Sequence, residues 1–269
     1  MPHDGVMPET RRDLVFEDHF EGPSLDLDVW SPYYLPHWSS REASAATYTV
    51  GDSSLTLSIP PDQGLWCEGD HKPDLRVSGI QSGNYSGPVG SKVGQQPYRD
   101  GLVVREEQMP FWGWTPNGGY IELRARAEIS PRSMVSLWMV GLEDQPERCA
   151  EICVMEAFGD AIEPGSAAVG MGLHSFRDPS VPEDFKAVRL PIDLREFHKY
   201  AVHWSPGEAS FYVDDTLIRS CQGAPSYPMQ LMLAIFDFPD RSVGHDADLV
   251  PTFTIDHIRG WNVAEQLIA

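Results

Sequence analysis

The sequence lacks any apolar run long enough for a membrane helix, and residues 1–13 lack the apolar core of a signal peptide. Nothing in it predicts a membrane-spanning segment. We therefore expect a cytoplasmic protein from the chain as given, or a secreted one if a leader has been trimmed or export is unconventional.

Basic residues are scarce, because the chain has 20 Lys and Arg against 40 Asp and Glu, a formal net charge of −20. Such a balance argues against nucleic-acid partners and against anionic membrane surfaces, and it favours a neutral substrate. An acidic surface also serves solubility alone, so the charge by itself names no function.

Cysteine is rare too, and Cys67, Cys149, Cys153 and Cys221 match no metal-ligand spacing. Cys149 and Cys153 lie too far apart along an extended strand to bridge. We predict free thiols, and a Cys67–Cys221 disulfide remains the alternative.

The sequence also contains no Ser/His/Asp order, Walker loop, H-E-x-x-H or dinucleotide fingerprint. No Ser/Pro/Gly-rich linker divides its 269 residues, so we predict an N-terminal extension, 1–13, and a single domain, 14–269, acting as a monomer. Helical periodicity is almost absent, whereas short strand patterns with turn signals recur. These patterns predict an all-β sandwich of two antiparallel sheets.

Two glutamates and a thiol occur within one strand-forming stretch, residues 151–156. In a regular strand Glu151 and Cys153 share one face and Glu156 points to the other. A β-bulge near Val154 and Met155 would return Glu156 to the face of Glu151. An edge strand with two solvated glutamates is the alternative, but apolar stretches at 134–140 and 169–172 favour an interior strand.

Two carboxyls about 5 to 5.5 Å apart form the catalytic pair of a retaining glycosidase, one as nucleophile and one as general acid/base. That chemistry is the function that this stretch predicts.

Other stretches give local predictions. A hairpin is expected over 47–50 and 55–59 around Gly51-Asp52-Ser53, and a strand over 101–107. The long loop 82–100 is expected to be functional or mobile.

A glycan groove would need side chains that stack on sugars or bind them. Trp138 faces either this groove or the core. His174 is a candidate for contact with the glycan, and a purely structural role is the alternative. Arg105 belongs to a charged run that either reaches the groove or is solvated. Aromatic residues in loops complete the candidate set, namely Trp38, Trp112 and Trp114.

Several segments, in order, are similar to those of glycoside hydrolase family 16, the laminarinase-like jelly rolls. They are residues 14–20, 119–126, 136–141, 197–206 and 211–214. The resemblance implies a jelly-roll β-sandwich (concanavalin A-like) and retaining, endo-acting hydrolysis of a β-linked polysaccharide or oligosaccharide, first of all a β-1,3-glucan.

The family signature is E-x-D-x-x-E. Carried over, it makes Glu151 the nucleophile and Glu156 the acid/base, with Cys153 in the place of the aspartate. A thiol between two carboxylates is expected to stay neutral and to be no nucleophile. Losing the supporting carboxyl would cost on the order of 10² in rate. A carbohydrate-binding, lectin-like protein and a transglycosylase therefore stay open as alternatives.

The resemblance also makes Asp256 similar to the family's late calcium-site aspartate. With backbone oxygens near Glu17 and Gly51, it would hold a structural Ca²⁺. No cofactor is expected for the chemistry itself.

Overall fold

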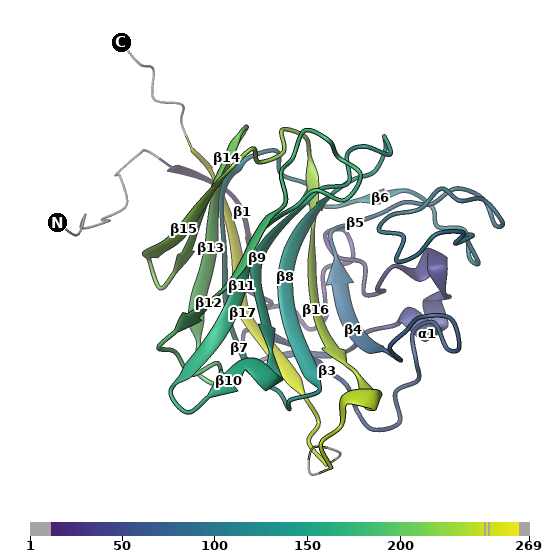
Figure 1. The fold of residues 1–269 in the computed structure, drawn as a ribbon, viewed down its shortest axis with the longest axis horizontal. Helices are drawn as coiled ribbons and strands as arrows, with labels where there is room; N and C mark the ends of the chain where they lie inside the picture. The colour runs from purple at the N-terminus through teal and green to yellow at the C-terminus, as the bar shows by residue number, and fades with distance from the viewer. Residues whose placement is uncertain (1–11, 245, 247, 264–269) are drawn as a thin grey trace.

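The computed structural model describes residues 12–244, 246 and 248–263, and they form two large antiparallel sheets packed face to face (Figure 1). The eight-stranded sheet has the order β15 (Thr216–Gln222), β14 (Glu208–Val213), β13 (His198–Ser205), β7 (Gly119–Glu128), β17 (Thr252–Val263), β3 (Ser54–Ser58), β2 (Thr47–Gly51), with β1 (Arg12–Asp18) also on β17. This is the predicted all-β jelly-roll sandwich.

The second sheet has seven strands and carries the stretch with the two glutamates. Its order is β10 (Ile162–Glu163), β11 (Ser166–His174), β9 (Glu151–Phe158), β8 (Ser133–Gly141), β16 (Met229–Asp237), β4 (Arg76–Gln81), with β12 (Asp184–Leu190) also on β11. The remaining elements are short: η1 (Pro36–Trp38), α1 (Arg41–Ser44), β5 (Gly83–Asn84), β6 (Phe111–Trp112), η2 (Gly159–Ala161) and η3 (Pro239–Arg241). None of the helices in the described part of the chain has the length and apolarity to cross a membrane.

The main core lies between the two sheets and follows the period of two in the strands. On β7, Ile121, Leu123 and Ala125 point into this core, whereas Arg124 stays partly exposed on the other face. A second cluster covers the other side of the seven-stranded sheet, which we call its outer face, and includes Trp138 and Cys153. Because both faces are covered, every residue of β8 and β16 is buried.

Two tight turns agree with their sequence signals. Asp52 and Ser53 join β2 to β3 with φ of 52° and 51°, and Asp214 and Asp215 join β14 to β15 with φ of 46° and 64°. Positive φ at both central residues matches the right-handed twist of a hairpin, and short polar side chains tolerate it best. The predicted 47–59 hairpin is therefore present.

Other local predictions are wrong. Residues 101–107 form no strand, because Val104 and Arg105 donate their backbone N–H groups to loop carbonyls of Ser91 and His37 rather than to a ladder. β12 was not predicted, since its partly exposed pattern resembles a loop. All four cysteines are free thiols, so the Cys67–Cys221 alternative is excluded.

Candidate active site on strand β9

The predicted bulge is present in β9 at Val154 and Met155. Trp138 of β8 lies opposite Cys153, and the next β8 residue, Leu137, lies opposite Met155, so Val154 is extra. The pairing with β11 shifts over the same stretch. Val154 and Met155 consequently both face the core between the sheets. Glu156 returns to the outer face, which Glu151 and Cys153 also occupy.

Glu151 is almost enclosed, with 8% of its surface exposed. The side-chain amide of Gln96 donates a hydrogen bond to one carboxyl oxygen, and Cys153 Sγ lies 3.8 Å from the other. Burial raises the pKa of Glu151 to about 8, and the nearby charge of Glu156 adds to the rise.

Glu156 is the more accessible of the two glutamates and lies opposite Ser136 on β8 and Gly170 on β11. Burial raises its pKa, and the nearby His174 lowers it in part. Two interacting carboxyls share their titration, so such a pair retains one proton more readily than either group alone. A proton donor beside a carboxylate is what glycoside hydrolysis needs.

Cys153 lies between the two glutamates and is buried. Burial raises the pKa of its thiol well above the usual range, and the charges of Glu151 and Glu156 raise it further. The site therefore favours the neutral thiol, in agreement with the expectation from sequence.

His174 ends β11 directly opposite Glu151. Its Nδ1 lies 2.5 Å from a carboxylate oxygen of Glu183, and its ring stacks on Phe185 with centroids 4.7 Å apart. These two contacts fix the ring on the same face as the glutamates, which is the placement that the sequence suggested for a cleft histidine.

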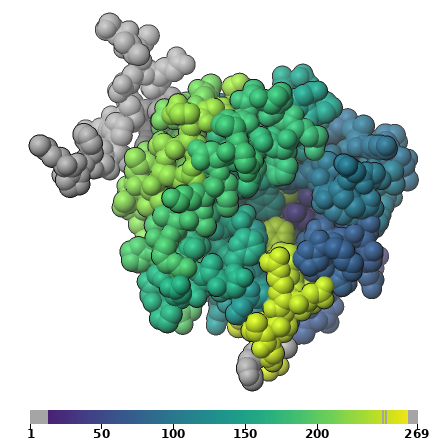
Figure 2. Space-filling view, viewed as in Figure 1, coloured from purple at the N-terminus to yellow at the C-terminus, as the bar shows by residue number. Residues whose placement is uncertain are grey.

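A pocket of about 190 Å³ opens beside Glu151. One wall is aromatic, with Trp66, Tyr98 and His71 separated by 4.9 to 5.6 Å between ring centroids and Tyr34 beside Trp66. Figure 2 shows the molecule hollowed between the blue loops and the teal-to-green strands. We call the pocket beside Glu151, together with the adjoining outer face of β9 that carries Cys153 and Glu156, the β9 cleft.

Glu143 and Arg177 line the same pocket as an ion pair with a 2.5 Å contact. The backbone N–H of Gln96 donates to the other Glu143 oxygen at 2.6 Å. Burial nevertheless raises the pKa of Glu143 to about 7, against the lowering effects of Gln96 and Arg177. Gln96 therefore joins two acidic groups of one pocket.

The predicted aromatic residues divide between cleft and core. Trp138 is 6% exposed and lies on the outer face, 6.4 Å from Tyr34 and 5.9 Å from Phe236 between centroids. It forms part of the floor under the cleft. Trp38 was expected to contact sugar, but it is fully buried and its Nε1 donates to the Gln95 carbonyl. That placement is a correction: Trp38 holds the loop that carries Gln96.

Trp112 is 39% exposed on β6 and stacks loosely on Tyr85, and it does not line the Glu151 pocket. Trp114 packs flat on Phe16 at 4.2 Å against the core between the sheets, so it is a packing residue instead of a groove residue. Arg105 forms an ion pair with Asp70 at 2.7 Å. The structure thus brings neither Trp114 nor Arg105 to the glutamates.

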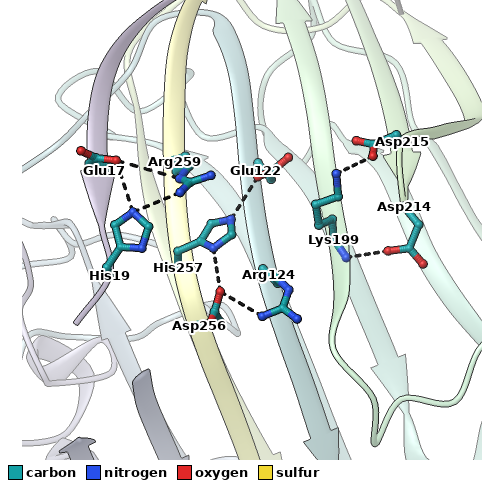
Figure 3. A network of polar contacts seen from close by, with 10 residues as sticks. All are labelled: Glu17, His19, Glu122, Arg124, Lys199, Asp214, Asp215, Asp256, His257 and Arg259. Atoms are coloured by element: carbon teal, nitrogen blue, oxygen red, sulfur yellow. Dashed lines mark hydrogen bonds and ion pairs between the residues drawn. The ribbon is translucent and has the colours of Figure 1, made fainter. Parts of the chain in front are cut away.

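Asp256, the predicted calcium ligand, belongs to a polar network on the outer side of the eight-stranded sheet (Figure 3). Its carboxylate contacts Arg124 at 3.1 Å and His257 at 2.8 Å. Glu17 of the neighbouring β1 contacts His19, which follows that strand, and Gly51 ends β2 opposite Ser54. No group of three acidic, histidine or cysteine ligands forms around Asp256 among the described residues.

Several residues of the cleft were not predicted from the sequence. Gln96 belongs to the long loop that was flagged as functional or mobile, but nothing in that loop singled it out. Glu143 and Arg177 resemble ordinary surface charges until the fold brings their loops together. The aromatic wall has no periodic signal either, because its members come from separate loops: Tyr34, Trp66, His71 and Tyr98.

Comparisons with known proteins agree with this geometry. Residues 119–248 match the model of glycosyl hydrolases family 16. A search of curated proteins finds no match. Among solved structures, the GlcNAcα1-4Gal-releasing endo-β-galactosidase of Clostridium perfringens is similar at 28% identity and a TM-score of 0.80. The match covers 97% of this chain and 65% of that one, so the chain spans less than two thirds of that relative's length.

Two laminarinases share the fold at lower identity. The laminarinase of Flavobacterium sp. UMI-01 is 20% identical with a TM-score of 0.64, covering 93% of this chain and all (100%) of that one. The endo-1,3-β-glucanase of Thermotoga petrophila is 17% identical with a TM-score of 0.63, covering 94% and 99%. The matched segment contains all of β9 and its bulge. The chain is therefore similar to the glycosyl hydrolases of family 16 over residues 119–248, and it shares their fold.

Proposed function

We propose that the protein is a retaining, endo-acting hydrolase of a β-linked glycan. The observation that carries this proposal is the bulge at Val154 and Met155, which puts Glu151 and Glu156 on one face of the sheet, where Glu151 lines a pocket. Glu151 would attack the anomeric carbon while Glu156 protonates the leaving oxygen. In the second step, Glu156 would take a proton from a water molecule, and this water would hydrolyse the covalent glycosyl-enzyme intermediate.

The surroundings of the two carboxyls support this division of roles. Glu151 is the more enclosed, and a donor from Gln96 holds one of its oxygens in place. A fixed carboxylate is suited to attack at one carbon. Glu156 is the more accessible, which suits a group that must exchange protons with the leaving group and with water. The pKa values of both carboxyls are raised, so the assignment of roles rests on accessibility and on the contact with Gln96.

Two substrate classes compete. The sequence resemblance favours a β-1,3-glucan or related β-glucan. The 28% identity to an endo-β-galactosidase favours a chain with internal β-galactosyl residues. In either case the partly exposed ring of Tyr98 in the aromatic wall offers a face on which a sugar ring can stack, whereas Trp66 is buried.

The experiment is to incubate the protein with β-1,3-glucan, β-1,3/1,4-glucan and a galactose-containing glycan, and to follow the products by chromatography and proton NMR. Internal cleavage with the β-anomer formed first supports the proposal. The matched control is Glu151→Gln, which keeps the side-chain size. Binding of oligosaccharide without product from the wild type would overturn the hydrolase in favour of a carbohydrate-binding protein, and transfer to an added sugar acceptor would favour a transglycosylase.

A structural Ca²⁺ at Asp256 and the monomeric state stay predictions. Calcium at Asp256 would raise the melting temperature of the wild type and leave that of Asp256→Asn unchanged.

A further inference from the structure

Three ligand types converge in the β9 cleft. A carboxylate oxygen of Glu151, the sulfur of Cys153 and a ring nitrogen of His174 all lie within 4.8 Å of one another. The pairing of β9 with β11 causes this, because His174 lies opposite Glu151 and Gly172 lies opposite Cys153. The cysteine spacing along the chain gave no metal signal, since the third ligand comes from another strand.

The separation suits a tetrahedral ion after small side-chain movements. Zn²⁺ binds sulfur at about 2.3 Å and nitrogen or oxygen at about 2.0 to 2.2 Å, which places neighbouring ligands roughly 3.3 to 3.8 Å apart. The sulfur already lies 3.8 Å from a Glu151 oxygen. Small movements of the three side chains, with the His174 ring keeping its plane, would close the remaining gap.

The histidine is also oriented as a ligand. Glu183 is bonded to Nδ1, so Nε2 is the ring nitrogen that remains for an ion. A carboxylate on the second ring nitrogen is the usual support of a metal-binding histidine, since it fixes the tautomer and raises the basicity of the ring. The stack on Phe185 holds the plane of the ring.

The charge around this cluster favours a cation. Glu156 lies on the same face, so a second acidic group adjoins the three ligands. Cys153 is the decisive residue, because sulfur and imidazole together favour Zn²⁺ and similar ions over Ca²⁺ or Mg²⁺. An aspartate in that position would supply a hard oxygen ligand instead.

We propose that Glu151, Cys153 and His174 bind one divalent transition-metal ion, with Zn²⁺ as the probe, and that the bound ion reversibly inhibits the enzyme by occupying the carboxylate of Glu151. The ion displaces the thiol proton of Cys153, which is released to water as the metal–sulfur bond forms. The inhibitory half of this inference rests on the proposed function. The binding half does not, because it concerns only the ligand geometry of this chain.

The test uses the metal-stripped full chain, titrated with Zn²⁺ by calorimetry and with Co²⁺ by absorption, where a thiolate-to-cobalt charge-transfer band reports sulfur ligation. We expect one ion per chain and the charge-transfer band. Cys153→Ser should abolish the charge-transfer band and lower the Zn²⁺ affinity by at least about 100-fold. His174→Gln should lower the Zn²⁺ affinity by a similar factor. Glu183→Gln should weaken binding by about 10- to 100-fold.

The matched control is Cys149→Ser, which replaces another buried cysteine, one that lines the pocket beside Glu151 and lies outside the cluster. It should keep wild-type Zn²⁺ affinity. Unchanged affinity in both Cys153→Ser and His174→Gln would place the metal elsewhere and overturn the proposal, as would the absence of binding. Should Cys153→Ser not fold, His174→Gln and Glu183→Gln still decide.

Activity is measured separately. Zn²⁺ should inhibit hydrolysis at the concentration at which it binds, and a chelator should restore it. Metal binding with no hydrolysis of any glycan would leave the site standing and remove the proposed function. Hydrolysis that Zn²⁺ does not inhibit would remove the inference and leave the function.

Discussion

Two acidic clusters occupy opposite sides of the sandwich, and they differ in whether the carboxylates have basic partners. We call the side on which they do the balanced side. On the outer side of the eight-stranded sheet, His257 has a carboxylate on each ring nitrogen, Glu122 at 3.0 Å and Asp256 at 2.8 Å, and Asp256 also contacts Arg124 (Figure 3). In the β9 cleft, the hydrogen-bond partners of Glu151 within the described part of the chain are the amide of Gln96 and the thiol of Cys153, and neither carries a positive charge.

The two sides also differ in the pKa values of their carboxyl groups. In the cleft the pKa of Glu151 rises to about 8 and that of Glu143 to about 7, in both cases first because of burial. On the other side, neighbouring His257 and Arg124 lower the pKa of Asp256 despite the opposing effect of burial. A protein holds unbalanced buried carboxyls at a cost, and such groups gather at functional sites. The balanced network is expected to serve stability, and the cleft to serve chemistry.

The largest expected effect is on the proposed nucleophile. Glu151→Gln should lower kcat by at least about 10⁴-fold, because the covalent step is lost while the side-chain volume is kept. Oligosaccharide affinity, measured by calorimetry, should stay within about threefold of the wild type.

Glu122→Gln is the control on the balanced side, with the same chemical change on a buried glutamate. It should leave kcat at the wild-type value. A Glu151→Gln variant as active as Glu122→Gln would mean that the cleft carboxyl is not the nucleophile.

The second effect concerns the thiol between the two glutamates. Cys153→Asp restores the signature carboxyl and should raise kcat on the order of 10², with KM little changed, because the new group supports Glu151 and does not contact distant sugar units. Cys153→Asn, which has the same size without the acid, should give a much smaller gain. Equal rates for these two variants in steady-state assays would show that the carboxyl itself is not what the site lacks.

The bulge could be predicted because a period of two puts Glu151 and Glu156 on opposite faces, and only an extra residue reconciles them. The interior position of β9 followed from the apolar stretches that became β8 and β11. Trp38 could not be placed, since an aromatic residue in a loop is equally able to pack or to face a ligand. Gln96 and the meeting of Cys153 with His174 depend on contacts between segments far apart in the sequence, which local patterns do not record.

The third effect is a pH dependence of the stability, which arises from the raised pKa of a buried carboxyl in the cleft. The pKa of Glu143 rises from 4.5 to about 7 in the fold. Between these values the folded state binds more protons than the unfolded state, so the stability of the wild type should fall as pH rises from about 4.5 to 7. Glu143→Gln removes the contribution of Glu143 to this dependence, while Glu151 keeps its own. Denaturant unfolding at pH 4.5 and pH 7.5 measures this difference. Relative to the wild type, the free energy of unfolding of the variant should rise by about 1 to 3 kcal/mol between the lower and the higher pH. A gain at low pH instead would mean that the pair with Arg177 dominates over burial.

The smallest effect belongs to the balanced side. Glu122→Gln keeps an oxygen that can accept from His257 but loses the charge of the carboxylate, so the free energy of unfolding should fall by about 1 kcal/mol. Lys199→Met, on β13 beside the same sheet face, removes an exposed ion pair with Asp215 and should cost less than about 0.5 kcal/mol. Urea unfolding of both variants checks the order. A larger loss of unfolding free energy in Lys199→Met than in Glu122→Gln would mean that exposed ion pairs stabilise this face more than the buried Glu122–His257 contact. The buried network would then not be what distinguishes this side from the cleft.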